Sequence, residues 1–93
     1  MYFLVRSKVE DYAKWKPVFD EMGTARKAAS SKGGYVLRNI NDSNEIVVLL
    51  EFEDLGKTRQ FAESEDLKQA MQRAGVVDKP DIYLLEETDR PSE

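Results

Sequence analysis

The sequence contains no cysteine and no histidine. Without cysteine there is no disulfide framework, no thiolate nucleophile and no cysteine-ligated zinc or iron–sulfur site. Without histidine, the commonest general base and the commonest transition-metal ligand are both missing. Much of the usual catalytic equipment is therefore absent, and we expect neither a metal site nor a bound cofactor.

The chain also lacks a surplus of positive charge and a long apolar run. Eighteen acidic residues against 14 basic ones give a net charge of −4. This sign opposes binding to nucleic acid or to an anionic membrane, and we expect neither as a partner. No apolar run approaches the roughly 18 residues of a spanning helix, and strand-like sequence from Tyr2 onward leaves no room for a signal peptide. The expected location is the cytoplasm.

At 93 residues the chain is short enough to be one domain. We place that domain at residues 1–88 and expect residues 89–93 to form a flexible, solvated tail, since they are charged or turn-forming. A domain of this size buries a modest core of its own.

Four segments are rich in the β-branched and aromatic residues that favour strands. They are residues 2–9, 35–40, 46–52 and 81–88. Residues 41–44 are all turn formers, so the two middle segments are expected to pair as a β-hairpin.

Between these strands, apolar residues recur every three or four positions, as on one face of a helix. The first helical stretch contains Pro17, and we expect its main helix to begin or kink there, because proline lacks the N–H that a helix interior needs. The second stretch is expected to restart once. The residues expected to start or stop the helices are Asp11, Ser30, Ser31, Gly33, Gly34, Asp54, Ser64 and Gly75.

The resulting order, β-α-β-β-α-β, predicts an α+β, ferredoxin-like fold. Its antiparallel sheet has four strands in the order 4-1-3-2, with two helices on one face. Residues 3–5 and 46–50 are apolar at every position, whereas a half-exposed strand alternates. This suits central strands, but two helices cover only one face of a sheet. We therefore expect a second copy of the chain to cover the other face, giving a homodimer.

The stretches VEDYAKWKPVFDEM, EIVVLLEFEDL and FAESEDLKQAMQRAGVVDKPDIYLLEE, together with this element order, resemble the dimeric α+β barrel superfamily. The similarity covers residues 1–88 and is nearest to the antibiotic-biosynthesis-monooxygenase-like and uncharacterised cyclase-like members. It implies a dimeric barrel, but the superfamily mixes cofactor-free oxygenases, haem-degrading enzymes, isomerases and proteins of unknown role. The haem-degrading branch needs a histidine ligand, which this chain lacks.

In such folds the space between helices and sheet is the default place for a small apolar or aromatic ligand. The candidate lining residues are Trp15, Phe19, Met22, Arg38, Phe52, Phe61, Met71 and Tyr83. Arg6 and Arg38 lie among apolar strand residues; pointing inward, either would meet a ligand carboxylate or phenolate, and otherwise each would pair with a glutamate such as Glu51 or Glu86. No catalytic residue is assigned.

Two functions remain open at this point. One is a binder of a small apolar or aromatic metabolite, with cofactor-independent monooxygenase-like chemistry as its enzymatic form. In that form the substrate itself supplies the electrons to oxygen, and Trp15, Arg38 and Tyr83 orient it. The other is a non-catalytic structural or regulatory dimer, in which the same aromatic and methionine side chains are ordinary packed core.

Overall fold

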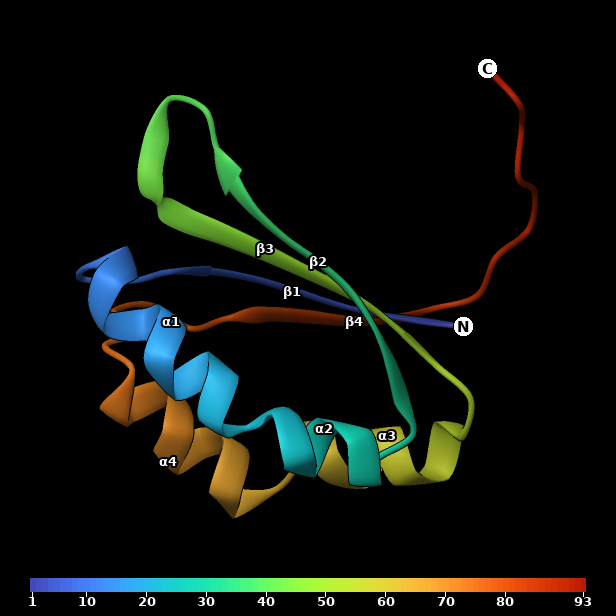
Figure 1. Ribbon diagram of the computed structural model, residues 1–93, viewed down its shortest axis with the longest axis horizontal. Helices are drawn as coiled ribbons and strands as arrows, with labels where there is room; N and C mark the ends of the chain where they lie inside the picture. Colours follow the sequence, from blue (N-terminus) through green and yellow to red (C-terminus); the bar gives the residue numbers. More distant parts are fainter.

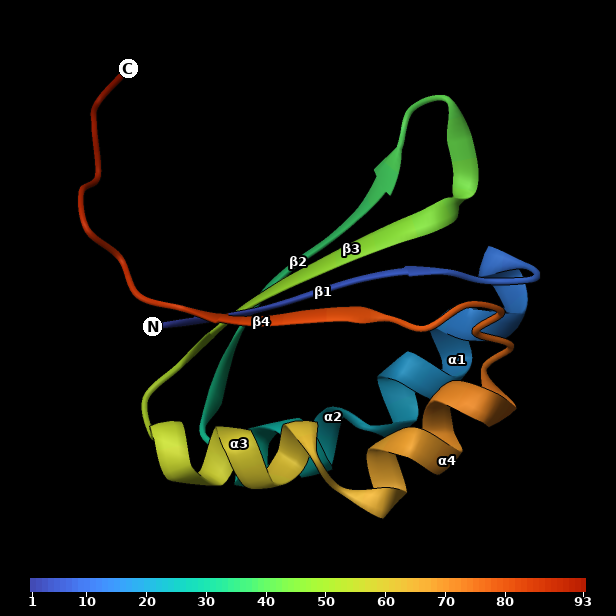
Figure 2. The same ribbon diagram turned by 180° about the vertical axis from the view of Figure 1, so that it is seen from behind.

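A computed structural model describes residues 1–93 as one four-stranded antiparallel sheet with helices against one of its faces (Figure 1). The elements follow in the order β1 (Tyr2–Lys8), α1 (Tyr12–Glu21), α2 (Gly23–Ala28), β2 (Ser31–Asn39), β3 (Asp42–Phe52), α3 (Leu55–Ala62), α4 (Glu65–Arg73) and β4 (Asp81–Leu85). The other face has no helix against it, as the view from behind also shows (Figure 2). We call it the open face. None of the helices has the length and apolarity needed to cross a membrane.

The strands are ordered β2-β3-β1-β4, which is the predicted order 4-1-3-2 read from the other edge. The predicted fold is therefore confirmed. The pairing of β1 with β3 sets Phe3 opposite Leu50 and Val5 opposite Val48, and all four are buried against the helices. Since alternate residues point to opposite faces, Leu4 and its partner Leu49 lie on the open face. Both central strands are thus apolar on both sides.

Three helices begin at side chains that the sequence marks as N-caps. The carboxylates of Asp11 and Asp54 accept hydrogen bonds from Ala13 N and Lys57 N, each at 3.0 Å. Ser64 Oγ accepts from Leu67 N at 3.2 Å, at the start of α4. Each cap satisfies a backbone N–H that the first helical turn leaves free. The predicted restart at Ser64 is confirmed.

The prediction that the main helix begins at Pro17 is wrong, because the helix already begins at Tyr12. Helix α1 runs through Pro17, and the chain leaves it at Met22, whose N–H is shared between Val18 O at 3.3 Å and Phe19 O at 3.2 Å. Pro17 removes the helical hydrogen bond to Ala13 O, but both residues are exposed, so water can satisfy that carbonyl. The helical path of the chain is interrupted at Met22, between α1 and α2, and again between α3 and α4. The helical layer thus contains four helices rather than two.

The two glycines predicted to end this helical segment instead belong to β2. The helix is ended by Ser30, whose φ of 78° is left-handed, and the strand begins at the next residue. At Gly34 an added Cβ would lie 2.0 Å from the backbone oxygen of Leu49 on the neighbouring strand. Glycine is thus required there by the close approach of the strands, which the sequence pattern does not reveal.

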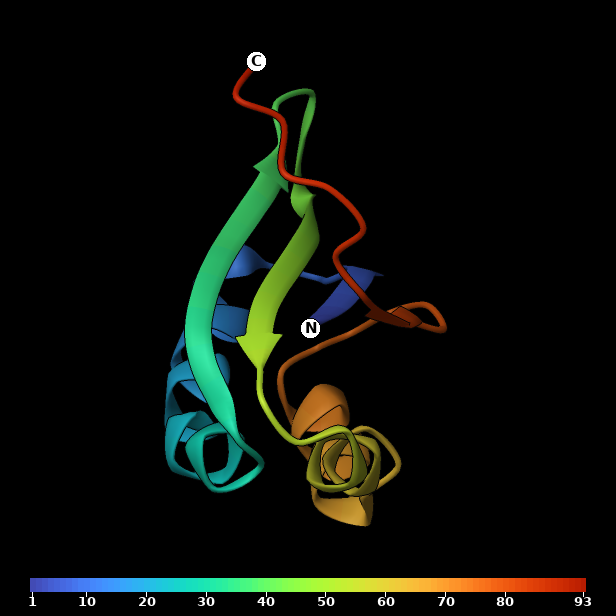
Figure 3. The same cartoon turned by 90° about the vertical axis from the view of Figure 1, so that its right-hand side faces the viewer.

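The strand limits also differ at the hairpin and at the C-terminal end. The turn is formed by Ile40 and Asn41, and residues 42–44 extend β3 rather than forming the predicted turn. Figure 3 shows β2 and β3 rising side by side from the helices to this turn. Strand β4 ends at Leu85, three residues before the predicted limit, and residues 86–93 have no regular structure. Their Glu87 accepts a hydrogen bond from Tyr2 Oη at 3.1 Å.

Ser64 joins two helices, which gives a first testable prediction. Its hydroxyl accepts from Leu67 N and donates to Phe61 O at 2.7 Å. Ser64→Ala is expected to lower the free energy of unfolding by about 1 kcal/mol, because it removes the cap of α4. Urea denaturation at fixed protein concentration measures this. The control is Ser43→Ala, since Ser43 is exposed in β3 and its hydroxyl has no partner; an equal loss in both variants would contradict the assignment.

Candidate functional site

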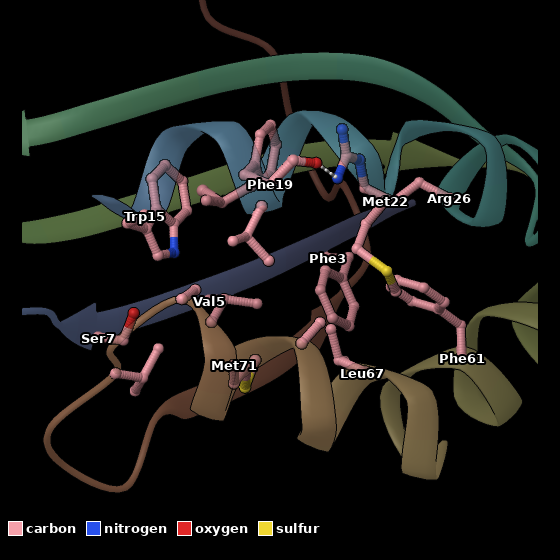
Figure 4. Close-up of a pocket in the computed structure, with 15 residues that line it drawn as sticks. Phe3, Val5, Ser7, Trp15, Phe19, Met22, Arg26, Phe61, Leu67 and Met71 are labelled. Atoms are coloured by element: carbon pink, nitrogen blue, oxygen red, sulfur yellow. Dashed lines mark hydrogen bonds between the residues drawn. The ribbon is translucent and has the colours of Figure 1, made fainter. Parts of the chain in front are cut away.

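A cavity of about 70 Å³ lies between α1, α4 and β1 (Figure 4). Thirteen of its 15 lining residues are hydrophobic. They come from β1 (Phe3, Val5), from α1 and its end (Trp15, Phe19, Met22) and from α3 and α4 (Phe61, Leu67, Met71), among others. Phe19, Met22 and Phe61 are only partly buried, so the cavity reaches the surface. It is smaller than the roughly 150 Å³ that holds a benzene ring, so a ligand must displace side chains, and flexible methionines suit that.

The wall formed by α1 is a row of aromatic rings. Tyr12, Trp15 and Phe19 follow the helical period, with ring centroids 5.8 Å and 4.9 Å apart along the row. Trp15 and Phe19 are stacked, and Trp15 is 6% exposed. An arginine lies over each end: Arg38 over the ring of Tyr12 at 4.5 Å, and Arg26 over the ring of Phe19 at 3.7 Å. These cation–π contacts fix the row in place.

Two polar groups face the cavity without a partner from the protein. The indole N–H of Trp15 and the hydroxyl of Ser7 make no hydrogen bond to another protein group, although Ser7 is only 4% exposed. Figure 4 shows both directed into the space between α1 and α4. No side-chain polar atom in the structure is both fully buried and without a partner, so water can reach the Trp15 N–H and the Ser7 hydroxyl in the cavity. These two groups therefore offer an unused donor and a hydroxyl at one end of an apolar cavity.

The remaining polar lining residue is Arg26, on α2. Its Nη1 donates to the backbone oxygen of Phe19 at 2.6 Å, and it forms no ion pair. Burial lowers the pKa of Arg26, and the nearby Asp20 carboxylate offsets this in part. Arg26 is not among the site residues predicted from the sequence. The signal that would have found it is its spacing, since Phe19, Met22 and Arg26 follow the helical period on one side.

The structure brings five of the predicted site residues together: Trp15, Phe19, Met22, Phe61 and Met71 all line the cavity. Phe52 lies outside it and borders a neighbouring cavity of about 10 Å³, near Phe3 and Phe61. Two predicted residues lie elsewhere. Arg38 lies on β2 over the outer ring of the aromatic row. Tyr83 pairs with Leu4, so it lies on the open face and is 54% exposed. Which of these residues bind a ligand remains a prediction.

The open face has an apolar centre with charged residues at one end. Its large apolar side chains are Leu4, Tyr35, Leu37, Val47, Leu49, Tyr83 and Leu85. At the charged end, Arg6 Nε donates to Glu45 at 2.9 Å, and Arg6 also pairs with Asp81 at 3.3 Å. A hydrogen bond from Asn39 and the Arg6 guanidinium hold the pKa of Glu45 below its usual range. Arg6 therefore points away from the cavity and is neutralised by carboxylates, though not by the glutamates expected from the sequence.

No model of a protein family matches the sequence, and no curated protein matches it. Solved structures, in contrast, show that the chain has the fold of antibiotic biosynthesis monooxygenases, so the resemblance noted from the sequence is confirmed at the level of the fold.

Three of these structures illustrate the likeness. A proposed antibiotic biosynthesis monooxygenase from Bordetella bronchiseptica superimposes with a TM-score of 0.75 and 12% identity, covering 94% of this chain and 95% of that one. A proposed one from Caulobacter crescentus gives 0.73 and 16%, covering 95% and 89%. SnoaB, a cofactor-independent oxygenase from Streptomyces nogalater, gives 0.66 and 17%, covering 94% and 93%. At these identities the likeness establishes the fold alone.

Proposed function

We propose that the chain binds a small aromatic or otherwise apolar metabolite in the cavity between α1, α4 and β1. The observation that carries this proposal is the pair of unpartnered polar groups, Trp15 N–H and Ser7 O–H, in an otherwise apolar cavity. A ligand oxygen between them would satisfy both, while aromatic carbon would pack against Phe19 and the methionines. Both groups are accessible to water in the free chain, so a ligand oxygen would take the place of water between them.

An oxygenase reaction is the enzymatic form of this proposal, supported by the likeness to SnoaB, a cofactor-independent oxygenase. The cavity lining includes no carboxylate, and the chain has no histidine, so no side chain with the usual pKa of a general base faces the ligand. The substrate would therefore have to react with oxygen through its own electrons, with no side-chain base in the lining to take its proton. The role left to the chain is to bind and orient the substrate. Of the residues expected to orient it, Trp15, Arg38 and Tyr83, only Trp15 lines the cavity.

Binding is tested with the chain's only tryptophan, which lines the cavity. Aromatic and polyketide-like metabolites are screened by thermal shift and by tryptophan emission. A ligand that raises the melting temperature is expected to change the Trp15 emission as well. Thermal-shift titration of Trp15→Phe, which keeps a ring but removes the N–H, is expected to give affinity about threefold to tenfold weaker, as for one lost hydrogen bond.

The matched control is Tyr12→Phe, since Tyr12 belongs to the same aromatic row but does not line the cavity. It is expected to leave affinity unchanged. If no compound changes either the melting temperature or the emission, the chain is instead the non-catalytic dimeric module with a packed interior.

We also propose that a second copy of the chain covers the open face. Support comes from its exposed apolar side chains, with Tyr35 at 65%, Leu37 at 49% and Tyr83 at 54% exposure, which together form a larger patch than single scattered residues. A two-fold pairing of sheets would bury them all. The cytoplasm stays the location expected from the sequence.

A further inference from the structure

One residue lining the cavity, Arg26, is positively charged and forms no ion pair with the protein. Arg26 is partly buried, and its guanidinium lies on the face of Phe19, which shields one side from water. Its only hydrogen bond uses Nη1, leaving Nε and Nη2 without protein partners. It forms no ion pair, and Asp20, the carboxylate that acts on it electrostatically, pairs with Lys16 at 2.6 Å.

We propose that Arg26 selects ligands that carry a negative charge, so that the metabolite is an aromatic acid or another planar organic anion. This inference rests on the proposed ligand site and narrows its chemistry. A guanidinium presents parallel N–H donors that match the two oxygens of a carboxylate, or one oxygen of a phenolate or enolate. Partial burial strengthens such a pair, because water competes for it less.

The polar groups lie at two separate ends of the cavity, so a matching ligand would carry a polar group at each of its own ends. Trp15 and Ser7 lie at the end of the cavity near the start of α1, while Arg26 comes from α2, beyond Met22 (Figure 4). Phe19 lies between them, stacked on Trp15 and under Arg26. The matching ligand has its charged oxygen at Arg26, an aromatic body along Phe19, and a hydrogen-bonding oxygen at Trp15.

The hydrogen bond from Arg26 to Phe19 O also has a structural role, since it satisfies a carbonyl in the last turn of α1. This hydrogen bond uses one N–H of Arg26, on Nη1, and does not depend on the charge of a bound ligand. A variant that merely loosened the end of α1 would weaken acids and neutral ligands alike. The ratio of the two affinities therefore separates charge selection from support of the helix.

The experiment compares benzoate with benzamide and cinnamate with cinnamamide, pairs of equal shape that differ by one charge. Binding to the ¹⁵N-labelled chain at neutral pH is followed through the single indole N–H resonance of Trp15. Each acid is expected to bind about tenfold or more tightly than its amide, the size of effect expected for a hydrogen-bonded charge. In the same wild-type spectra, the Arg26 Nε–H resonance is expected to move with the acid and not with the amide.

Arg26→Gln is expected to reduce the ratio of amide to acid dissociation constants to about one. The control is Arg73→Gln, which removes the same charge from α4, where Arg73 is exposed and pairs with Glu21 at 3.3 Å; it should keep the wild-type ratio. Equal binding of acid and amide by the wild-type chain, or the same loss in both variants, overturns the inference while leaving the site in place. If no probe moves the indole resonance at millimolar concentration, the proposed site falls, and this inference with it.

Discussion

Replacing Gly34 with alanine is expected to lower the free energy of unfolding by about 3 kcal/mol and to detach β2 from the sheet. The added Cβ would lie 2.0 Å from the backbone oxygen of Leu49 and 2.9 Å from the Cα of Leu50. These are backbone atoms of β3, so no side-chain rotation relieves the overlap. The strands must separate, and the loss is measured by urea denaturation at fixed protein concentration, since assembly also contributes to stability.

Gly56→Ala is the matched control for this prediction. Gly56 lies in the first turn of α3, where an added Cβ meets only the Asp54 side chain, at 3.4 Å. Alanine there is expected to be neutral or to stabilise the chain by about 0.5–1 kcal/mol, because it lowers the entropy cost of forming a helix. A Gly34→Ala variant as stable as the wild type would show that β2 and β3 do not approach this closely.

Leu49→Asp is expected to weaken the proposed dimer about a hundredfold or more. Leu49 pairs with Leu4 on one side and Tyr35 on the other, which places it in the apolar centre of the open face. A carboxylate there would be buried against the partner without a counter-ion, and such unpaired charges are among the costliest interface changes. Light scattering after gel filtration is expected to give twice the mass of the chain for the wild type and the mass of one chain for the variant.

Leu55→Asp provides the comparison, because Leu55 is 37% exposed at the start of α3, in the helical layer and away from the open face. It should stay dimeric. A wild-type chain that runs as a monomer at micromolar concentration would refute the proposed assembly. So would a Leu49→Asp variant that keeps the dimer while remaining folded by circular dichroism.

The fold was predictable because several independent signals agree on it. Residues 3–5 and 46–50 lack alternation, and they do form parts of the two central strands. Caps such as Asp54 and Ser64 mark their helices locally, through the first free N–H groups. These features depend on a few neighbouring residues, so they can be read without the tertiary structure.

The errors concern residues whose effect depends on tertiary surroundings. Pro17 is tolerated because Ala13, whose carbonyl it leaves without a donor, is exposed, and exposure follows from how α1 lies on the sheet. Gly34 resembles a helix stop by composition, yet its function is to let two strands approach. Propensity cannot separate these cases, because the same residue type serves both.

Some residues of the candidate site are likewise predictable from local spacing, whereas others depend on the tertiary structure. Trp15, Phe19 and Met22 follow from helical spacing alone, and the structure places them in one cavity. Arg26 continues that spacing, but a charged residue at the end of an apolar stripe is usually solvated, so the sequence alone does not single it out. Tyr83 is predicted to line the cavity, but its pairing with Leu4 turns it to the open face. That register is set only when β4 pairs with β1, so the sequence alone does not reveal it.

Strand β1 separates the cavity from the open face, together with Val48 of the neighbouring strand β3. Phe3, Val5 and Ser7 line the cavity, while Leu4 and Arg6, alternating with them, belong to the open face. A ligand and a partner chain would thus contact opposite sides of the same seven residues. If ligand binding changes the affinity between the two chains by some factor, pairing of the chains changes the ligand affinity by the same factor, since such coupling is reciprocal. Occupancy of the cavity and association of the chains would therefore be thermodynamically linked through one strand.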